Sequence, residues 1–129
     1  MMNVAKILMV GLHPNAIDYS PYPDLDEATL SARIEQGLAA VRAAGFDAEH
    51  CLVGVDPDEA EKTVRAVVGE DSVALAMFGA GVRMAAEHTV LFERLINLLV
   101  AQAPGIRFCF NTSPETTIDA LRRWAPQVS

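Results

Sequence analysis

Two side chains capable of chemistry follow apolar segments of the chain. His13 comes shortly after the apolar run 7–10, where a neutral imidazole could act as a general base or hold a ligand oxygen. Arg83 follows the run 73–78, and its guanidinium could bind a carboxylate or phosphate through two hydrogen bonds. We therefore expect a site for a small anionic molecule, with His13 as base and Arg83 as anion clamp. The alternative for His13 is a cap on carbonyl groups at the strand end.

Gly79 and Gly81 stand just before Arg83. Two glycines allow backbone N–H groups to approach a ligand, and the amino terminus of a following helix, expected over 85–103, would add partial positive charge. His88, near the first turn of that helix, is a third candidate catalytic residue. The alternatives are a tight turn for the glycines and a solvated surface position for His88.

The segment GAGVRM is only superficially like a dinucleotide-binding fingerprint. It lacks the third glycine and follows the third predicted strand, whereas the fingerprint follows the first strand. A nicotinamide or flavin site is therefore not expected, and the sequence assigns no cofactor.

The segment 13–24 is long for a strand-to-helix loop, which usually has about 2–6 residues. Three prolines stiffen it, and both tyrosines of the chain lie in it. We expect it to form a wall or lid over the crevice, with Asp18 orienting His13 and Tyr19 contacting the ligand. The alternatives are a loop packed for its own sake and a subunit contact.

Further candidates follow the fourth apolar run. Asn111 and Thr112 could line the far side of the crevice as ligand-binding residues. Thr112 is explained equally well as the cap of the last helix, with Glu115 completing a capping box, and Asp24 with Glu27 marks the first helix in the same way. His50 is expected at the start of the second strand, away from the crevice, and receives no role.

Four apolar runs alternating with four helical patterns must position these residues. Strict alternation of strand and helix favours parallel strands joined by right-handed crossovers. We expect one domain over 1–129 with three α/β/α layers and a four-stranded parallel sheet in the order 2-1-3-4, a flavodoxin-like or Rossmann-like fold. Ligands of such sheets bind beyond the carboxyl ends of the strands where the order reverses, here between strands 1 and 3. The runs are 7–10, 51–53, 73–78 and 107–110, and the helices are expected over 25–44, 56–69, 85–103 and 112–124.

The helix expected over 85–103 is unusually apolar. Between residues 90 and 100, Glu93, Arg94 and Asn97 mark only a narrow polar side, although a helix packed on a sheet needs one apolar stripe. We therefore expect a homodimer through 90–100. The alternative is coverage by neighbouring helices of the same chain.

Composition and charge restrict the possible partners. The net charge is −7, from 17 acidic and 10 basic side chains, and no cluster of basic residues suggests a nucleic acid partner. No Cys/His pattern indicates a metal site, and Cys51 and Cys109 are expected to be buried at opposite sheet edges without a disulfide. The longest uncharged stretch is about half of the ~20 residues that cross a bilayer, and no signal-peptide pattern is seen. We expect a cytoplasmic protein without membrane contact.

Several families with related architecture are excluded by particular residues. Receiver domains need an acidic pair after strand 1 and an aspartate at the end of strand 3, where this chain has Gly11, Leu12, His13 and Gly79. The Ser/Thr-rich phosphate loop of flavodoxins is absent, as are a P-loop and a Gly-x-Ser-x-Gly elbow.

Four segments carry a resemblance that spans most of the chain: GLHP at 11–14, GAGVR at 79–83, LFERLIN at 91–97 and FNTSPE at 110–115. The chain resembles a family of small uncharacterised microbial α/β proteins, which implies the same fold and no particular activity. Two functions stay open. One is binding of a small anionic metabolite, with or without catalysis, and the other is a non-enzymatic interaction or regulatory module acting through the long loop and the apolar helix. A pocket reaching His13 and Arg83 would favour the first, and a crevice filled by Tyr19 or Tyr22 the second.

Overall fold

The computed structural model describes residues 6–128, with side chains through residue 125. Its strands are β1 (Lys6–Leu12), β2 (Ala48–Val53), β3 (Val73–Phe78) and β4 (Arg107–Phe110). The long helices are α1 (Glu27–Ala43), α2 (Pro57–Val68), α4 (Thr89–Gln102) and α5 (Thr117–Val128), and the short ones are η1 (Pro14–Ala16), α3 (Ala80–Arg83), η2 (Ala86–His88) and η3 (Pro114–Thr116).

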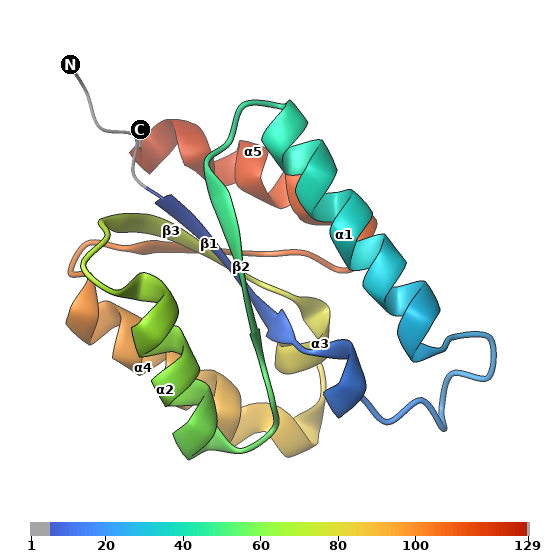
Figure 1. Cartoon of the computed structure of the whole chain (residues 1–129). Coiled ribbons are helices and arrows are strands. Elements are labelled where there is room, and N and C mark those ends of the chain that lie inside the picture. The colour runs from blue at the N-terminus through green and yellow to red at the C-terminus, as the bar shows by residue number, and fades with distance from the viewer. Residues whose placement is uncertain (1–5, 129) are drawn as a thin grey trace.

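The four strands form one parallel sheet in the order β2-β1-β3-β4. Helices α1 and α5 cover one face and α2 and α4 cover the other (Figure 1). The predicted three-layer α/β/α architecture and strand order are therefore confirmed. The central strands β1 and β3 are covered on both faces, which is why their sequences are apolar at consecutive positions.

Side chains alternate between the two faces and build two apolar clusters. On the α1/α5 side, Met9, Met77 and Cys109 pack with Val41 and Leu121. On the α2/α4 side the strands contribute side chains such as Leu8 and Phe78 to the larger cluster. Burying one such large side chain contributes about 1.5–3 kcal/mol to folding.

The helix expected over 85–103 forms as η2 followed by α4, and a separate short helix, α3, precedes it. Val82 of α3 is fully buried in the larger cluster, and the chain then turns through Ala85, whose backbone is extended (φ −94°, ψ 123°), before α4 runs back along the sheet. His88 consequently precedes α4 instead of lying in its first turn. The two glycines therefore open a helix of four residues and not the long one.

The apolar surface of α4 is covered largely by the same chain. Leu91, Leu95 and Leu99 are buried, and the partly buried side chains around them belong to the same cluster. Val90 and Val100 remain 55% and 48% exposed. The alternative to a dimer, coverage by neighbouring elements, accounts for most of this surface.

Two predicted helix caps are displaced along the chain. Asp26, and not Asp24, caps α1 by accepting from the N–H of Thr29 at 2.7 Å. Ser113, and not Thr112, begins η3 and forms a capping box with Thr116. A cap must directly precede the first helical residue, and Pro114 takes that position in η3.

The positions of the two cysteines agree with the expectation from the sequence. Cys51 in β2 and Cys109 in β4 are buried, free thiols at opposite edges of the sheet. None of the helices described over residues 6–128 has the length and apolar character needed to cross a bilayer. Within the same residues, no group of three or more His, Cys, Asp or Glu side chains could hold a metal ion.

Candidate functional site

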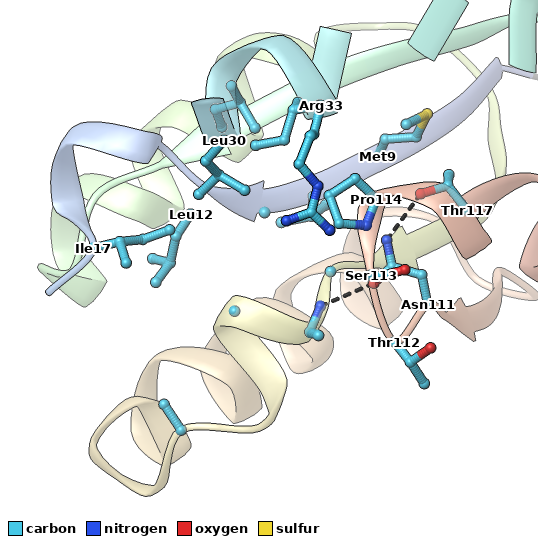
Figure 2. Close-up of a pocket in the computed structure, with 18 of the residues that line it drawn as sticks. Met9, Leu12, Ile17, Leu30, Arg33, Asn111, Thr112, Ser113, Pro114 and Thr117 are labelled. Carbon is cyan, nitrogen blue, oxygen red and sulfur yellow. Dashed lines mark hydrogen bonds between the residues drawn. The ribbon is translucent and has the colours of Figure 1, made fainter. Parts of the chain in front are cut away.

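A cavity of about 450 Å³ opens at the carboxyl ends of β1 and β3, on the α1 side of the sheet (Figure 2). Its volume lies within the range of roughly 300–1,000 Å³ that is usual for small-molecule sites. It also lies where the strand order reverses, the place where parallel α/β sheets bind ligands. We call it the glycine-floored cavity, after Gly11 and Gly79.

The two glycines explain why this space is open. Met9 and Met77 are paired in register and point to the α1/α5 side. Two residues further along each chain segment, on the same face, stand Gly11 and Gly79. On this face the two central strands therefore carry large side chains up to the methionines and none beyond them. The space that two further side chains would occupy is left beneath the amino-terminal half of α1.

The walls of the glycine-floored cavity are mainly apolar. Helix α1 contributes Leu30 and Ile34, β2 contributes Leu52, and the long loop contributes Ile17 and Tyr22. Figure 2 shows Leu12 and Ile17 on one side and Leu30 above. A ligand with an apolar body would bury that body against these side chains.

The long loop forms part of the wall, but its predicted contacts differ in detail. Asp18 lines the cavity, and hydrogen bonds from the hydroxyl and backbone N–H of Ser20 lower its pKa. Tyr19 does not line it, since its hydroxyl donates to the carbonyl of Pro14 at 2.6 Å. Tyr22 reaches the cavity and remains exposed.

His13 lies outside the cavity. The side chain is exposed, and Nδ1 accepts from the N–H of Asn15 at 3.2 Å, which caps η1. Asp18 therefore does not hold it through any hydrogen bond among the described residues. His13 therefore caps η1. The alternative expected from the sequence was also a cap, but one on carbonyl groups, whereas Nδ1 here accepts from an N–H.

Arg83 also lies outside the lining of the cavity. Its Nη2 donates to the carbonyl of Asn111 at 2.8 Å, and the guanidinium carbon lies 5.3 Å from the centre of the Phe110 ring. Its Nε is buried and finds no partner among the described residues. The cavity therefore does not bring His13 and Arg83 together, and their catalytic roles stay predictions.

The remaining predicted residues do line the glycine-floored cavity: Gly79, Gly81, His88, Asn111 and Thr112. Asn111 makes hydrogen bonds through both atoms of its side-chain amide. Its Oδ1 accepts from the N–H of Ala80 at 3.0 Å, and its Nδ2 donates to Oγ1 of buried Thr117 at 2.9 Å (Figure 2). Because both amide atoms are engaged, Asn111 joins α3, β4 and α5 around the cavity.

Arg33, on α1, lines the cavity and was missed by the sequence analysis. Its Nε and Nη2 donate to the two carboxylate oxygens of Glu115 at 2.8 and 2.6 Å. This pairing lowers the pKa of Glu115 to about 2. In the sequence, Arg33 stands three residues after Leu30 and one before Ile34. This spacing places it beside the apolar stripe of the helix that faces the sheet.

His50 was also missed, and its predicted position was wrong. It is the third residue of β2, paired with Met9 in register, and it lines the cavity. Its Nε2 is buried without a partner among the described residues. Burial lowers its pKa, while Glu35 raises it and Arg42 lowers it further. In the sequence, His50 alternates with Ala48 and Leu52, and this spacing indicates that the three side chains share one face of the strand.

Comparison with known proteins adds no function to this geometry. No family model matches the chain, and no curated protein matches it either. Of the expected resemblance to microbial proteins, the structure therefore supports only the small α/β fold.

Proposed function

We propose that this protein binds a small anionic metabolite with an apolar body in the glycine-floored cavity. The observation that carries the proposal is an open space of about 450 Å³ at the reversal of strand order, where two glycines replace side chains. Protein interiors are packed nearly as tightly as organic crystals. Apolar surface left without partner atoms gives up dispersion and burial energy that a ligand would restore.

The polar groups around the cavity support a ligand with one charged end. Arg33 provides a guanidinium at the wall, the role that the sequence suggested for Arg83. The imidazoles of His50 and His88 also line the cavity. Of the three predicted catalytic residues, His88 is the one that lines the cavity, and it is our candidate for catalysis.

The alternative, a non-enzymatic interaction or regulatory module, would be favoured by a crevice filled with tyrosine. Tyr19 is instead held by the carbonyl of Pro14, and Tyr22 stands exposed at the cavity wall. The space beyond the strands is open, which favours a small ligand over this alternative.

A thermal-shift screen against a panel of metabolites tests the proposal, because a ligand of the folded state raises its stability with ligand concentration. The variant Gly11→Leu places a side chain in the cavity, and Gly54→Leu is the matched control. Gly54 lies just after β2, outside the lining, and a Cβ there meets nothing within 4 Å.

We expect at least one acidic metabolite to stabilise the wild type and Gly54→Leu but not Gly11→Leu. Circular dichroism before the screen establishes that each variant is folded. If a ligand stabilises all three proteins equally, or if the panel yields no ligand, the proposal fails.

We also propose the homodimer through residues 90–100 that the sequence suggests, supported by the exposure of Val90 and Val100. Sedimentation at micromolar concentration should then give a mass near twice 13.9 kDa. A monomer at ~100 μM overturns it, because a stable pair has a Kd far below that concentration. A cytoplasmic location likewise stays a prediction.

A further inference from the structure

We propose that the ligand is a monocarboxylic acid whose carboxylate binds the end of the Arg33 guanidinium formed by Nη1 and Nη2, while Glu115 positions that guanidinium. This inference rests on the proposed function, because it names the ligand class and the anchoring group for the same cavity.

The hydrogen bonds of Arg33 leave one edge for a ligand. A guanidinium has five N–H donors arranged along two edges that each match a carboxylate. Glu115 takes the edge formed by Nε and Nη2, with both of its oxygens. One donor of Nη1 and the second donor of Nη2 form the other edge, and the remaining donor of Nη1 points back toward Cδ. A carboxylate placed there would accept two parallel hydrogen bonds, the strongest arrangement available to this pair.

Glu115 lies on the outer side of Arg33. Arg33 lines both the glycine-floored cavity and a separate depression between α1 and η3, whereas Glu115 lines only that depression. Figure 2 shows Arg33 reaching from α1 toward Pro114, next to Leu30. The ion pair thus approaches the guanidinium from outside and leaves the cavity side to a ligand.

The contact between α1 and η3 holds both partners of the ion pair in place. A Cβ on Gly37 would lie only 3.0 Å from the carbonyl oxygen of Pro114, so glycine lets the helix approach η3 closely. Arg33 lies one helical turn before Gly37, and Glu115 follows Pro114 directly. The side chains of Arg33 and Glu115 are 36% and 57% exposed, so an ion pair here contributes little to stability. Its effect is to orient Arg33.

The charges around the cavity favour one acidic group on the ligand, and not two. Asp18 and Glu87 also line the cavity, and their carboxylates would repel a second anionic group. Asp18 follows Ile17, which lies on the far side of the cavity from Arg33 in Figure 2. The remaining wall is mainly apolar, with side chains such as Met9, Leu30 and Met77. A carboxylate at Arg33 with a hydrocarbon body extending along that wall satisfies both features.

The test uses two pairs of probes of equal shape: octanoate with octanamide, and 4-phenylbutyrate with 4-phenylbutyramide. Binding is measured by titration calorimetry to the full chain and to Arg33→Met, Arg33→Lys and the control Arg122→Met. Arg122 is an exposed arginine outside the cavity lining, so its replacement makes the same change in net charge.

We expect the wild type and Arg122→Met to prefer each acid over its amide. Arg33→Met should weaken binding of the acids on the order of 10- to 100-fold, the range of a charged hydrogen bond, and leave the amides nearly unchanged. Arg33→Lys should recover part of the loss, since an ammonium lacks the planar fork. Equal binding of acids and amides, or an equal effect of Arg122→Met, overturns the inference.

Glu115 is tested through the preference for acid over amide. Glu115→Gln should reduce this preference and Glu115→Asp should restore part of it, whereas a purely structural role would change acids and amides alike. If Glu115→Gln instead strengthens binding of the acids, Glu115 competes with the ligand and does not position Arg33.

Gly11→Leu separates failure of this inference from failure of the proposed function. If acids and amides bind equally and both are lost in Gly11→Leu, the carboxylate inference fails and the cavity proposal survives. The carboxylate inference also fails, and the cavity proposal survives, if neither acid binds while the metabolite screen finds a ligand sensitive to Gly11→Leu. If the acids bind Gly11→Leu as well as the wild type, the cavity is not their site and the proposed function fails too.

Discussion

Gly79 stands so close to Gly11 that a Cβ on Gly79 would lie 3.9 Å from the Cα of Gly11. The two residues end neighbouring strands on the same face of the sheet, and neither has a positive φ. Their backbones could therefore accommodate other residues. The absence of side chains here provides open space in front of α1, and that space is the candidate site.

Gly11→Ala should stabilise the fold by about 0.4–1 kcal/mol, because alanine restricts the unfolded chain and fits this backbone. Its Cβ would lie 3.8 Å from Cδ2 of Leu52, an ordinary contact. Urea denaturation measures the change in the free energy of unfolding. The same substitution should weaken any ligand of the cavity, since the added methyl group occupies its floor.

Gly45→Ala is the control for this prediction. Gly45 follows α1 with φ +97°, a region that L-residues with a side chain rarely adopt, so this change should destabilise the protein. A loss of stability in Gly11→Ala similar to that in Gly45→Ala would show that the strand end itself requires glycine.

Asn111→Ala should lower the free energy of unfolding by about 1–3 kcal/mol, because it leaves the Ala80 N–H and the Thr117 hydroxyl without their partner. Thr117→Val should also destabilise, since it removes the acceptor of the Asn111 amide. Chemical denaturation of both variants and of the double variant gives the coupling between them. The double variant should lose less than the sum of the two, because one hydrogen bond is shared. Strict additivity would contradict this arrangement.

His50 should make the protein less stable as the solution becomes mildly acidic. Burial, the main cause, lowers its pKa in the folded state below the ordinary value of 6.5. Glu35 raises this pKa and Arg42 lowers it. The neutral form is thus favoured on folding. Its contribution is fully present above pH 6.5 and is lost as the pH falls from 6.5 through the folded-state pKa.

The melting temperature measured between pH 8 and pH 5 should fall less steeply for His50→Gln than for the wild type. His88→Gln is the matched control, because the His88 side chain makes no hydrogen bond among the described residues. The slope of this variant should stay close to that of the wild type. Parallel curves for wild type and His50→Gln would refute this prediction. Glu115 does not interfere in this window, because its pKa is about 2 in the folded protein and 4.5 ordinarily.

Cys51 and Cys109 should be almost unreactive toward an aromatic disulfide reagent at pH 8 in the folded protein. Burial raises the pKa of each thiol to about 12, and the thiolate is the form that reacts. Two thiols per chain should react rapidly in denaturant. Rapid reaction of either thiol without denaturant would contradict the burial of these strands.

The architecture could be predicted because its causes are local patterns repeated along the chain. Apolar runs such as 73–78 alternate with helical stripes such as that of α2, and this alternation permits few topologies. The cap of α1 was predicted wrongly, because Asp24 and Glu27 have the spacing of a capping box although Asp26 is the residue that directly precedes the helix. Only the backbone around Thr29 selects Asp26.

The amino-acid sequence by itself determined the four-stranded parallel sheet and its order, and it predicted the end of the sheet at which the cavity lies. The tertiary structure alone decided which side chains surround that place. His13 and Arg83 follow the right strands, but each makes hydrogen bonds to nearby backbone groups outside the cavity. Arg33 and His50 come from α1 and β2 and reach the cavity by helix packing and strand register. Position along the chain sets where a residue leaves the sheet, whereas the direction of its side chain depends on contacts between segments far apart in sequence.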